Sequence, residues 1–331
     1  MRNMQKFFAY LLAVLVLVNL FGCSKSSTEP EQTKAEIQTL IEYLEGAGGD
    51  YINTTAPKIV TASAVMQAGL GTYKILDIRA AADYNAGHIQ GAINVTLAEI
   101  YNYVKANFSK TDKILVVCYT GQSAGHAVLA LNLMGFDAYS LKFGMSSWHA
   151  DFDKWTANCN SGFASHFTKD VTAKPAKGNY PTINTGKSTA EEILEARVQA
   201  MLSEGFKGIN AADVLANPDN YFILNYFSEA DYLGQGNCPL GHIKGAMQYT
   251  PKASLKSTAD LATLPTDKKI VVYCWTGQNS SQVAAFLNVL GYDAVSLKFG
   301  VNGMIHDHLT GSKWDPNTAI AGYDYVTSGG K

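Results

Sequence analysis

The chain carries one long stretch of sequence twice, as "KILVVCYTGQSAGHAVLALNLMGFDAYSLKFG" and as "KIVVYCWTGQNSSQVAAFLNVLGYDAVSLKFG". The cysteines of the two stretches, Cys118 and Cys274, are 156 residues apart. Further upstream, "GHIQGAINV" recurs as "GHIKGAMQY" at a separation of 154 residues. A repeat of this length is too long for one unit of a solenoid, so it predicts a duplicated domain.

The repeat also sets the expected domain boundaries. The first domain is predicted over 34–158 and the second over 189–318, where the insertion "YLGQGNCPLGH" makes the second copy slightly longer. Residues 159–188 are rich in Gly, Pro, Ser, Thr and Asn, a composition typical of a linker. Residues 319–331 remain as a C-terminal tail.

Each copy alternates between strand-like and helix-like segments. In the first copy, "YKILDI", "KILVVC" and "DAYSLK" are short apolar runs typical of strands, and "AGHAVLALNLMGF" has helical spacing and a glycine near its end. Strand, helix and strand in this order imply parallel pairing with helices on both faces. We therefore expect an α/β fold of two domains, each a small parallel sheet covered by helices on both faces.

The N-terminus predicts export and lipidation. Basic residues precede an apolar run over 7–21, which is too short to span a membrane and suits the core of a signal peptide over residues 1–22. The run ends in "LFGC", which resembles the lipobox of bacterial lipoproteins and implies lipidation of Cys23. Residues 23–33 are polar and predict a flexible tether. An uncleaved anchor and an ordinary secretory signal are the alternatives.

Localisation and partners follow from the same features. Ser24, rather than aspartate, follows the cysteine, and in an organism with two membranes this resemblance favours the outer membrane. The predicted location is thus the cell envelope, with the protein facing the periplasm or the cell exterior. The formal net charge is −2 and no cluster of Lys or Arg stands out, which argues against a nucleic-acid partner.

The repeated cysteines lie where parallel α/β sheets place their sites. Cys118 and Cys274 each come directly after a buried strand and before a Thr-Gly-Gln turn and a helix. Backbone N–H groups of the turn and the start of the helix would favour a thiolate and would cradle an anionic group on the sulfur. Gly121 and Gly277 suit a tight turn. The alternative interpretation is a pair of buried structural thiols.

The combined pattern resembles the rhodanese family. The segments that carry the resemblance are "LDIRAAADYNAGHIQGAINV", the loop that begins with the cysteine, and "LKFGMSSW". The resemblance implies that Cys118 and Cys274 are catalytic and carry sulfane sulfur as a persulfide. It also implies substrate-binding loops made of Tyr119, Thr120, Gly121, Gln122 and Ser123 in the first copy and of Trp275, Thr276, Gly277, Gln278 and Asn279 in the second. Within this family the Gly-His block is a structural turn.

Neither loop contains an arginine. The loops "CYTGQS" and "CWTGQN" are neutral, and Ala124 and Ser280 stand where a phosphatase on this scaffold would need arginine to hold phosphate. Candidate anion-binding residues are therefore sought elsewhere, namely Arg79, Lys142 and Lys298. For the two lysines, the alternative is an ordinary solvated side chain.

The two copies differ beside their cysteines. The second copy has asparagine and phenylalanine at positions 225 and 227, where the first has Asp77 and Arg79, so its site is expected to be more apolar. Two further cysteines, Cys159 and Cys238, could form a disulfide or remain free, and Cys238 could be a resolving thiol. We find no spacing typical of metal ligands and no nucleotide-binding loop, so no metal and no cofactor are predicted.

These features favour an exported, lipid-anchored sulfurtransferase of rhodanese type. Its expected partners are a small sulfur or other chalcogen donor, such as a selenium compound, and a thiol or other nucleophilic acceptor. The alternative is a non-catalytic lipoprotein that uses the same fold to bind a partner such as a membrane redox complex. Retention of both loop cysteines favours the enzyme, whereas the neutral loops favour the scaffold.

Overall fold

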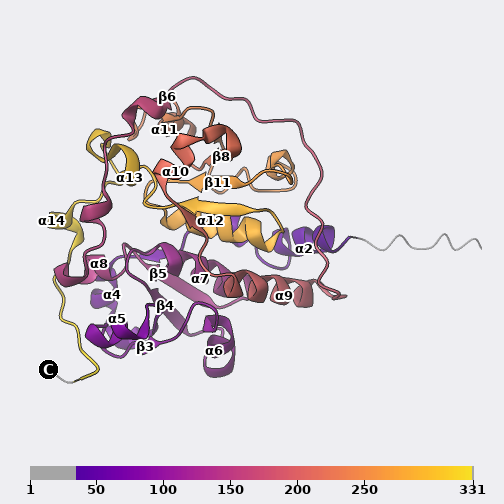
Figure 1. Ribbon diagram of the computed structural model, residues 1–331. Helices are drawn as coiled ribbons and strands as arrows, with labels where there is room; N and C mark the ends of the chain where they lie inside the picture. The colour runs from indigo at the N-terminus through magenta and orange to yellow at the C-terminus, as the bar shows by residue number, and fades with distance from the viewer. Residues whose placement is uncertain (1–34, 330–331) are drawn as a thin grey trace, which may run out of the picture. The chain divides into compact units, whose positions relative to one another are not determined.

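A computed structural model of the chain describes residues 35–329 (Figure 1). The predicted signal peptide, the lipidation site at Cys23 and the tether all lie outside the described residues. Within residues 35–329, no helix combines the length and the apolar character needed to cross a bilayer.

The first copy is built on a parallel sheet of five strands with the order β1-β5-β4-β2-β3. Its strands are β1 (Ile59–Val60), β2 (Tyr73–Asp77), β3 (Ile93–Asn94), β4 (Lys113–Val117) and β5 (Asp137–Leu141). Its helices are α2 (Glu36–Glu45), α3 (Tyr51–Thr54), α4 (Ala62–Ala68), α5 (Ala81–Ala86), α6 (Ile100–Asn107), α7 (Gln122–Leu133) and α8 (Met145–Trp148).

The second copy repeats this order as β10-β8-β11-β12-β7, again with every pair parallel. Its strands are β7 (Gly208–Ile209), β8 (Phe222–Asn225), β10 (Met247–Gln248), β11 (Ile270–Tyr273) and β12 (Ala294–Leu297). Its helices are α9 (Ala190–Ser203), α10 (Ala211–Ala216), α11 (Glu229–Tyr232), α12 (Gln278–Val289), α13 (Asn302–Ile305) and α14 (Pro316–Ala319). The predicted α/β fold of two small parallel sheets is confirmed.

The strand that leads to each cysteine is buried on both faces. Along β4, Ile114 and Val116 join the cluster that includes α7, whereas Leu115 and Val117 join a separate cluster on the opposite face of the sheet. Successive side chains of a strand point to opposite faces, so a strand covered on both faces is apolar at every position. This is why "KILVV" is a continuous apolar run.

The two copies pack against each other through helices. Helices α7 and α12 lie side by side between the two sheets, and α2 of the first copy packs against α9 of the second (Figure 1). The Tyr51 hydroxyl donates a hydrogen bond of 2.8 Å across the junction to Gln282 Oε1. Helix α9 begins with a capping box between Thr189 and Glu192, which fixes its start.

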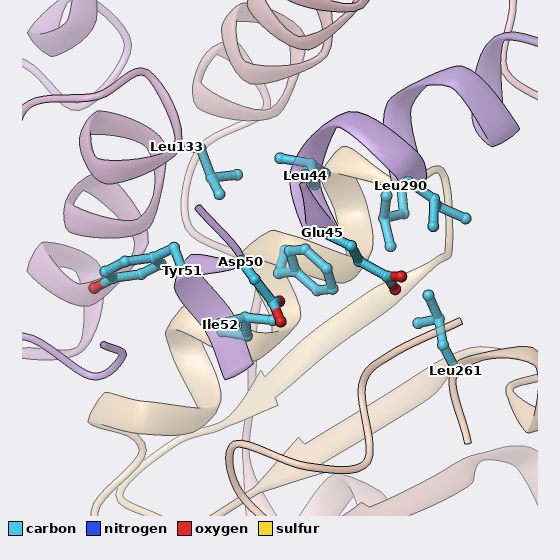
Figure 2. A pocket seen from close by; sticks show the side chains of 10 residues that line it. Leu44, Glu45, Asp50, Tyr51, Ile52, Leu133, Leu261 and Leu290 are labelled. Atoms are coloured by element: carbon cyan, nitrogen blue, oxygen red, sulfur yellow. The ribbon is translucent and has the colours of Figure 1, made fainter. Parts of the chain in front are cut away.

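A small cavity lies within this junction (Figure 2). Leu44, Leu133 and Leu290, which come from three different helical segments, line it. Its volume is about 10 Å³, which is about the space that one water molecule needs. The junction is therefore closely packed, and this cavity is too small to hold a substrate.

The segments that follow the two copies are exchanged between them. The predicted linker contributes β6 (Phe167–Thr168), which pairs antiparallel with β9 (His242–Ile243) of the second copy. The predicted tail forms the equivalent bridge in the first copy, between Val326 and His88. Each copy is thus completed by chain that lies outside its predicted boundaries.

Candidate active site

The first cysteine lies at the carboxyl end of β4. Gly121 has a left-handed φ of 80° and precedes α7, so the chain turns directly from strand to helix. The Cys118 Sγ atom accepts hydrogen bonds from the backbone N–H of Gly121 at 3.1 Å and of Ala124 at 3.4 Å. Two donors and a helix N-terminus aimed at one sulfur stabilise negative charge on it.

The second cysteine has the same position but different hydrogen bonds. The Cys274 Sγ atom accepts from the backbone N–H of Ser280 at 3.3 Å, and its thiol lies 3.5 Å from Ser280 Oγ, to which it donates. Ser280 Oγ also lies 2.9 Å from Ser296 Oγ. The equivalent of Ser280 in the first copy is Ala124, so a side-chain hydroxyl at this place distinguishes the second sulfur from the first.

Both cysteines are almost fully buried. Cys118 is 4% exposed and Cys274 is 2% exposed, whereas the aromatic residues that follow them, Tyr119 and Trp275, are half-buried. A donor must therefore enter a nearly closed site to reach each sulfur. Limited access of water would also protect a persulfide from side reactions.

The remaining loop residues stabilise the loops. Thr120 Oγ1 accepts a hydrogen bond of 3.1 Å from Gln122 Nε2, and Thr276 Oγ1 accepts the equivalent bond from Gln278 Nε2. Ser123 and Asn279 are half-buried in the first turns of α7 and α12.

A tight turn after the last strand supports each loop. In the first copy, the Met145 N–H donates to the Cys118 carbonyl at 2.8 Å, and in the second the Val301 N–H donates to the Cys274 carbonyl at 3.0 Å. Gly144 has a φ of 60°, and a Cβ atom there would overlap the Cys118 carbonyl oxygen. Glycine is therefore required in "LKFG" because the turn touches the loop.

A buried ion pair lies beside the first loop. Arg79 Nη2 lies 2.6 Å from Asp77 Oδ2 and donates to the Gly87 carbonyl at 2.6 Å. The guanidinium carbon lies 5.0 Å from the centre of the Tyr119 ring. Arg79 Nη1 is buried and makes no hydrogen bond within the protein. The predicted residue Arg79 thus lies next to the loop, with one donor unused.

A second cation at this loop, Lys154, was not predicted from the sequence. The Lys154 Nζ atom lies 5.5 Å from the centre of the Tyr119 ring, and the lysine is exposed. Asp83 is a neighbour of the same ring and contributes, after burial, to raising the pKa of the Tyr119 hydroxyl. The signal for Lys154 lay in "DFDKW", downstream of the loop, where sequence distance gave no indication of proximity.

The second loop has an aromatic neighbour instead. The Phe227 ring is stacked on Trp275, with the ring centres 4.6 Å apart. The Tyr273 hydroxyl accepts hydrogen bonds from Asn225 Nδ2 at 2.8 Å and from the Ile243 N–H at 3.1 Å. Where the first copy has an ion pair, the second therefore has a neutral polar pair and an aromatic stack.

The two lysines predicted to bind anions make other contacts. The Lys142 Nζ atom lies 5.2 Å from the centre of the Phe143 ring, and the exposed side chain lines an open cavity with Lys313 and Tyr323. The Lys298 Nζ atom donates to Asn210 Oδ1 at 3.3 Å. None of these contacts involves a residue of a cysteine loop, and the anion-binding role of the two lysines stays a prediction.

Comparison with known proteins agrees with this architecture. The family model of the rhodanese-like domain matches residues 63–151 and 213–306. The chain belongs to the rhodanese-like family. The predictions of two rhodanese-like domains and of a rhodanese-type sulfurtransferase are therefore confirmed at the level of the family.

Individual relatives match single rhodanese-like domains. The thiosulfate sulfurtransferase GlpE of Shewanella oneidensis is 38% identical over 78 residues, which cover 23% of this chain and 75% of that protein. GlpE of Pseudomonas fluorescens is 34% identical over 88 residues, covering 26% of this chain and 80% of that protein. The crystal structure of a rhodanese-related protein from Thermoplasma volcanium is 24% identical, with a TM-score of 0.26, and covers 28% of this chain and 89% of that chain.

The histidines of both rhodanese-like domains have structural contacts. The His88 ring is stacked on Tyr84, and its Nδ1 atom lies 2.8 Å from the Tyr84 carbonyl. The His242 ring is stacked in the same way on Tyr232. His126 lies on α7 and is buried, which lowers its pKa to about 4. It is therefore neutral near pH 7.

Within residues 35–329, the two cysteines outside the loops, Cys159 and Cys238, are free thiols. Cys159 is half-buried, and burial, with a smaller contribution from Asp153, raises its pKa to about 11. Cys238 is fully buried and donates to the Gly241 carbonyl at 3.0 Å, and burial raises its pKa to about 12. Burial thus disfavours the thiolate of both residues, and neither environment activates a resolving nucleophile.

Proposed function

We propose that the protein is an exported, lipid-anchored sulfurtransferase that carries sulfane sulfur as a persulfide on Cys118 and on Cys274. The observation that carries this proposal is the pair of strand-end sulfurs at the starts of helices, where Cys118 accepts from two backbone N–H groups and Cys274 from one. That environment favours the thiolate that must attack a donor.

The transfer has two balanced steps. The cysteine thiolate attacks the outer sulfur of the donor, the S–S bond of the donor breaks, and the remainder leaves with the bonding electron pair; from thiosulfate the leaving group is sulfite. A nucleophilic acceptor such as a thiolate then attacks the outer sulfur of the persulfide, and the cysteine leaves again as the thiolate. The loop N–H groups stabilise the sulfur anion at the start and at the end of the cycle.

We infer a division of labour between the two sites. An anionic donor loses hydration when it enters a buried site, and nearby cations offset that cost. The Cys118 loop has Arg79 and Lys154 at its aromatic ring, whereas the equivalent ring in the second copy contacts Phe227. Cys118 is thus suited to anionic donors such as thiosulfate, and Cys274 to less charged sulfur or selenium donors.

The lipid anchor is part of the same proposal and rests on the sequence alone. Lipidation at Cys23 would hold the mature protein at a membrane of the cell envelope through its tether. Stable anchoring requires more than one acyl chain. Replacing Cys23 with alanine should release the protein from the membrane fraction; persistent attachment of that variant would contradict lipidation as the means of anchoring.

Steady-state turnover of single-cysteine variants tests the division of labour. With thiosulfate as donor and a thiol as acceptor, Cys118→Ser should abolish most activity and Cys274→Ser should leave most of it. The opposite order would contradict the assignment. Loss of turnover with every donor, in wild type as well, would favour the non-catalytic binding protein, an alternative that the low exposure of both sulfurs also favours.

A further inference from the structure

Two buried glutamines connect the cysteine loops of opposite copies. Gln122 begins α7 and is 3% exposed, and Gln278 begins α12 and is 1% exposed. Gln278 Oε1 accepts a hydrogen bond of 2.8 Å from the backbone N–H of Phe143, in the first copy. Gln122 Oε1 accepts the equivalent bond of 2.9 Å from the backbone N–H of Phe299, in the second copy.

The orientation of each amide is fixed by its partners. A backbone N–H can only donate, so the oxygen of Gln278 must face Phe143. Its nitrogen then donates to Thr276 Oγ1 in its own loop. Each glutamine is therefore anchored in the loop of one copy and supplies an acceptor to the other copy.

The residue that donates each bond lies in a strained turn next to a cysteine loop. Phe143 has a left-handed φ of 62° and Phe299 one of 61°, a conformation that costs free energy for residues other than glycine. Gly144 follows Phe143 and packs directly on the backbone of the Cys118 loop. A shift of the Phe143 N–H would therefore move Gly144 and, with it, the Cys118 loop.

The same place is shielded from water by aromatic rings. Phe143 packs edge-on against Trp155 and Trp314 at ring-centre distances of 5.0 and 4.9 Å, and Phe299 packs against Trp155 at 5.0 Å. The Phe143 side chain is buried, and so is the glutamine that its backbone contacts. Removal of the glutamine oxygen would therefore leave a buried N–H without a partner, at the residue whose backbone is already strained.

We propose that Gln278 is a positioning residue for the Cys118 loop and that Gln122 is the positioning residue for the Cys274 loop. Each sulfur-carrying loop is then completed by the opposite copy, and the two sites are coupled through the α7–α12 junction. The inference rests on the proposed function only in assigning sulfur transfer to the loops; the structural dependence of one loop on the other is independent of it.

Hydrogen exchange of the full chain tests this dependence directly. Gln278→Met removes the acceptor at similar volume, and Gln278→Asn keeps an amide that is too short to reach. Both should speed exchange of the Phe143 N–H by roughly tenfold or more and loosen the Cys118 loop. Gln278→Glu offers a carboxyl oxygen of the same reach and should restore protection. The matched control is Gln282→Met, a buried glutamine one turn later on α12 that contacts Tyr51 instead.

The functional readout uses a Cys274→Ser background, in which only the Cys118 loop carries a reactive sulfur. There, Gln278→Met and Gln278→Asn should slow sulfur loading of Cys118 by about tenfold relative to the Cys274→Ser parent. Faster exchange at Phe143 with no loading in any variant would contradict the proposed function alone. The positioning role would be overturned if the changes in hydrogen exchange were confined to residues 274–280. It would also be overturned if Gln282→Met changed the exchange of the Phe143 N–H as much as Gln278→Met does.

Discussion

The Oγ atom of Ser280 lies 3.5 Å from the Sγ atom of Cys274, within hydrogen-bond reach of the second sulfur. In the thiol state the cysteine donates to this oxygen, and after deprotonation the hydroxyl can rotate its hydrogen toward the sulfur. The first copy has Ala124 at the equivalent position, and this residue contacts the sulfur through its backbone N–H but has no side-chain hydroxyl.

Removal of the hydroxyl should slow sulfur loading at the second site, whereas its introduction at the first site should not. A hydrogen bond to a charged group contributes about 1.5–3 kcal/mol, so Ser280→Ala should slow sulfur loading of Cys274 by about tenfold. Ala124→Ser should leave Cys118 loading equal or faster. Loading rates measured by mass spectrometry on each single-cysteine background check this. Unchanged Cys274 loading in Ser280→Ala would show that the hydroxyl does not contribute.

Lys154 should favour anionic donors at the first site. Its ammonium group lies at the Tyr119 ring, so Lys154→Met should raise the KM for thiosulfate severalfold and should affect an uncharged donor less. Lys142→Met is the matched control, because Lys142 lies over Phe143 instead. Steady-state kinetics with both donors provide the measurement. If Lys142→Met raised the KM for thiosulfate more than Lys154→Met did, Lys142 would be the anion-binding residue, as the sequence predicts.

His126 should make the folded state sensitive to acid. Burial lowers its pKa from an ordinary 6.5 to about 4, and its Nε2 atom makes no hydrogen bond within the protein. Below pH 6.5 the His126 imidazole binds a proton in the unfolded chain but stays neutral in the folded chain. The free energy of unfolding therefore decreases as the pH falls from 6.5 to about 4. The loss should reach about 3 kcal/mol.

The variant His126→Gln, which copies the glutamine found at the equivalent position 282, should remove this component. Urea unfolding of both proteins at pH 7 and at pH 4.5 provides the comparison. The same loss of stability in wild type and variant would show that other groups cause it.

The thiols of Cys159 and Cys238 should react only slowly with alkylating reagents near neutral pH. With a pKa of about 11, Cys159 is almost entirely protonated at pH 8, and its alkylation rate should rise about tenfold per pH unit up to pH 10. Cys238 is fully buried and should be labelled only after unfolding. Alkylation of the Cys118→Ser/Cys274→Ser double variant against pH checks both. A Cys159 rate that levels off near pH 8 would contradict the effect of burial.

The fold and the place of the cysteines could be predicted because their causes are local. A strand buried on both faces is a continuous apolar run, and the cysteine directly after it must lie at the sheet edge, as Val117 and Cys118 do. The duplication then predicted two equivalent domains. The contrast between Arg79 and Phe227 was visible for the same reason, since both positions follow a recognisable strand.

The surroundings of the sites could not be predicted because they depend on contacts between distant segments. The 3₁₀ turn at Ala150–Phe152 brings Lys154 to the Tyr119 ring, and so short a turn leaves no hydrophobic period in the sequence from which it could be predicted. Gln122 and Gln278 were assigned to their own loops, and only the packing of α7 on α12 gives each a partner in the other copy. The exchange of β6 with the tail likewise depends on how the copies meet.

Whether the loop cysteines carry sulfur is decided by mass spectrometry of the mature protein after separate exposure to thiosulfate and to polysulfide. We expect addition of one sulfur atom at Cys118 with thiosulfate and at both Cys118 and Cys274 with polysulfide, and a thiol acceptor should remove it. Cys159 and Cys238 should remain unmodified. Absence of sulfur at both loop cysteines with either donor, or its addition only at Cys159 or Cys238, would contradict the proposed function.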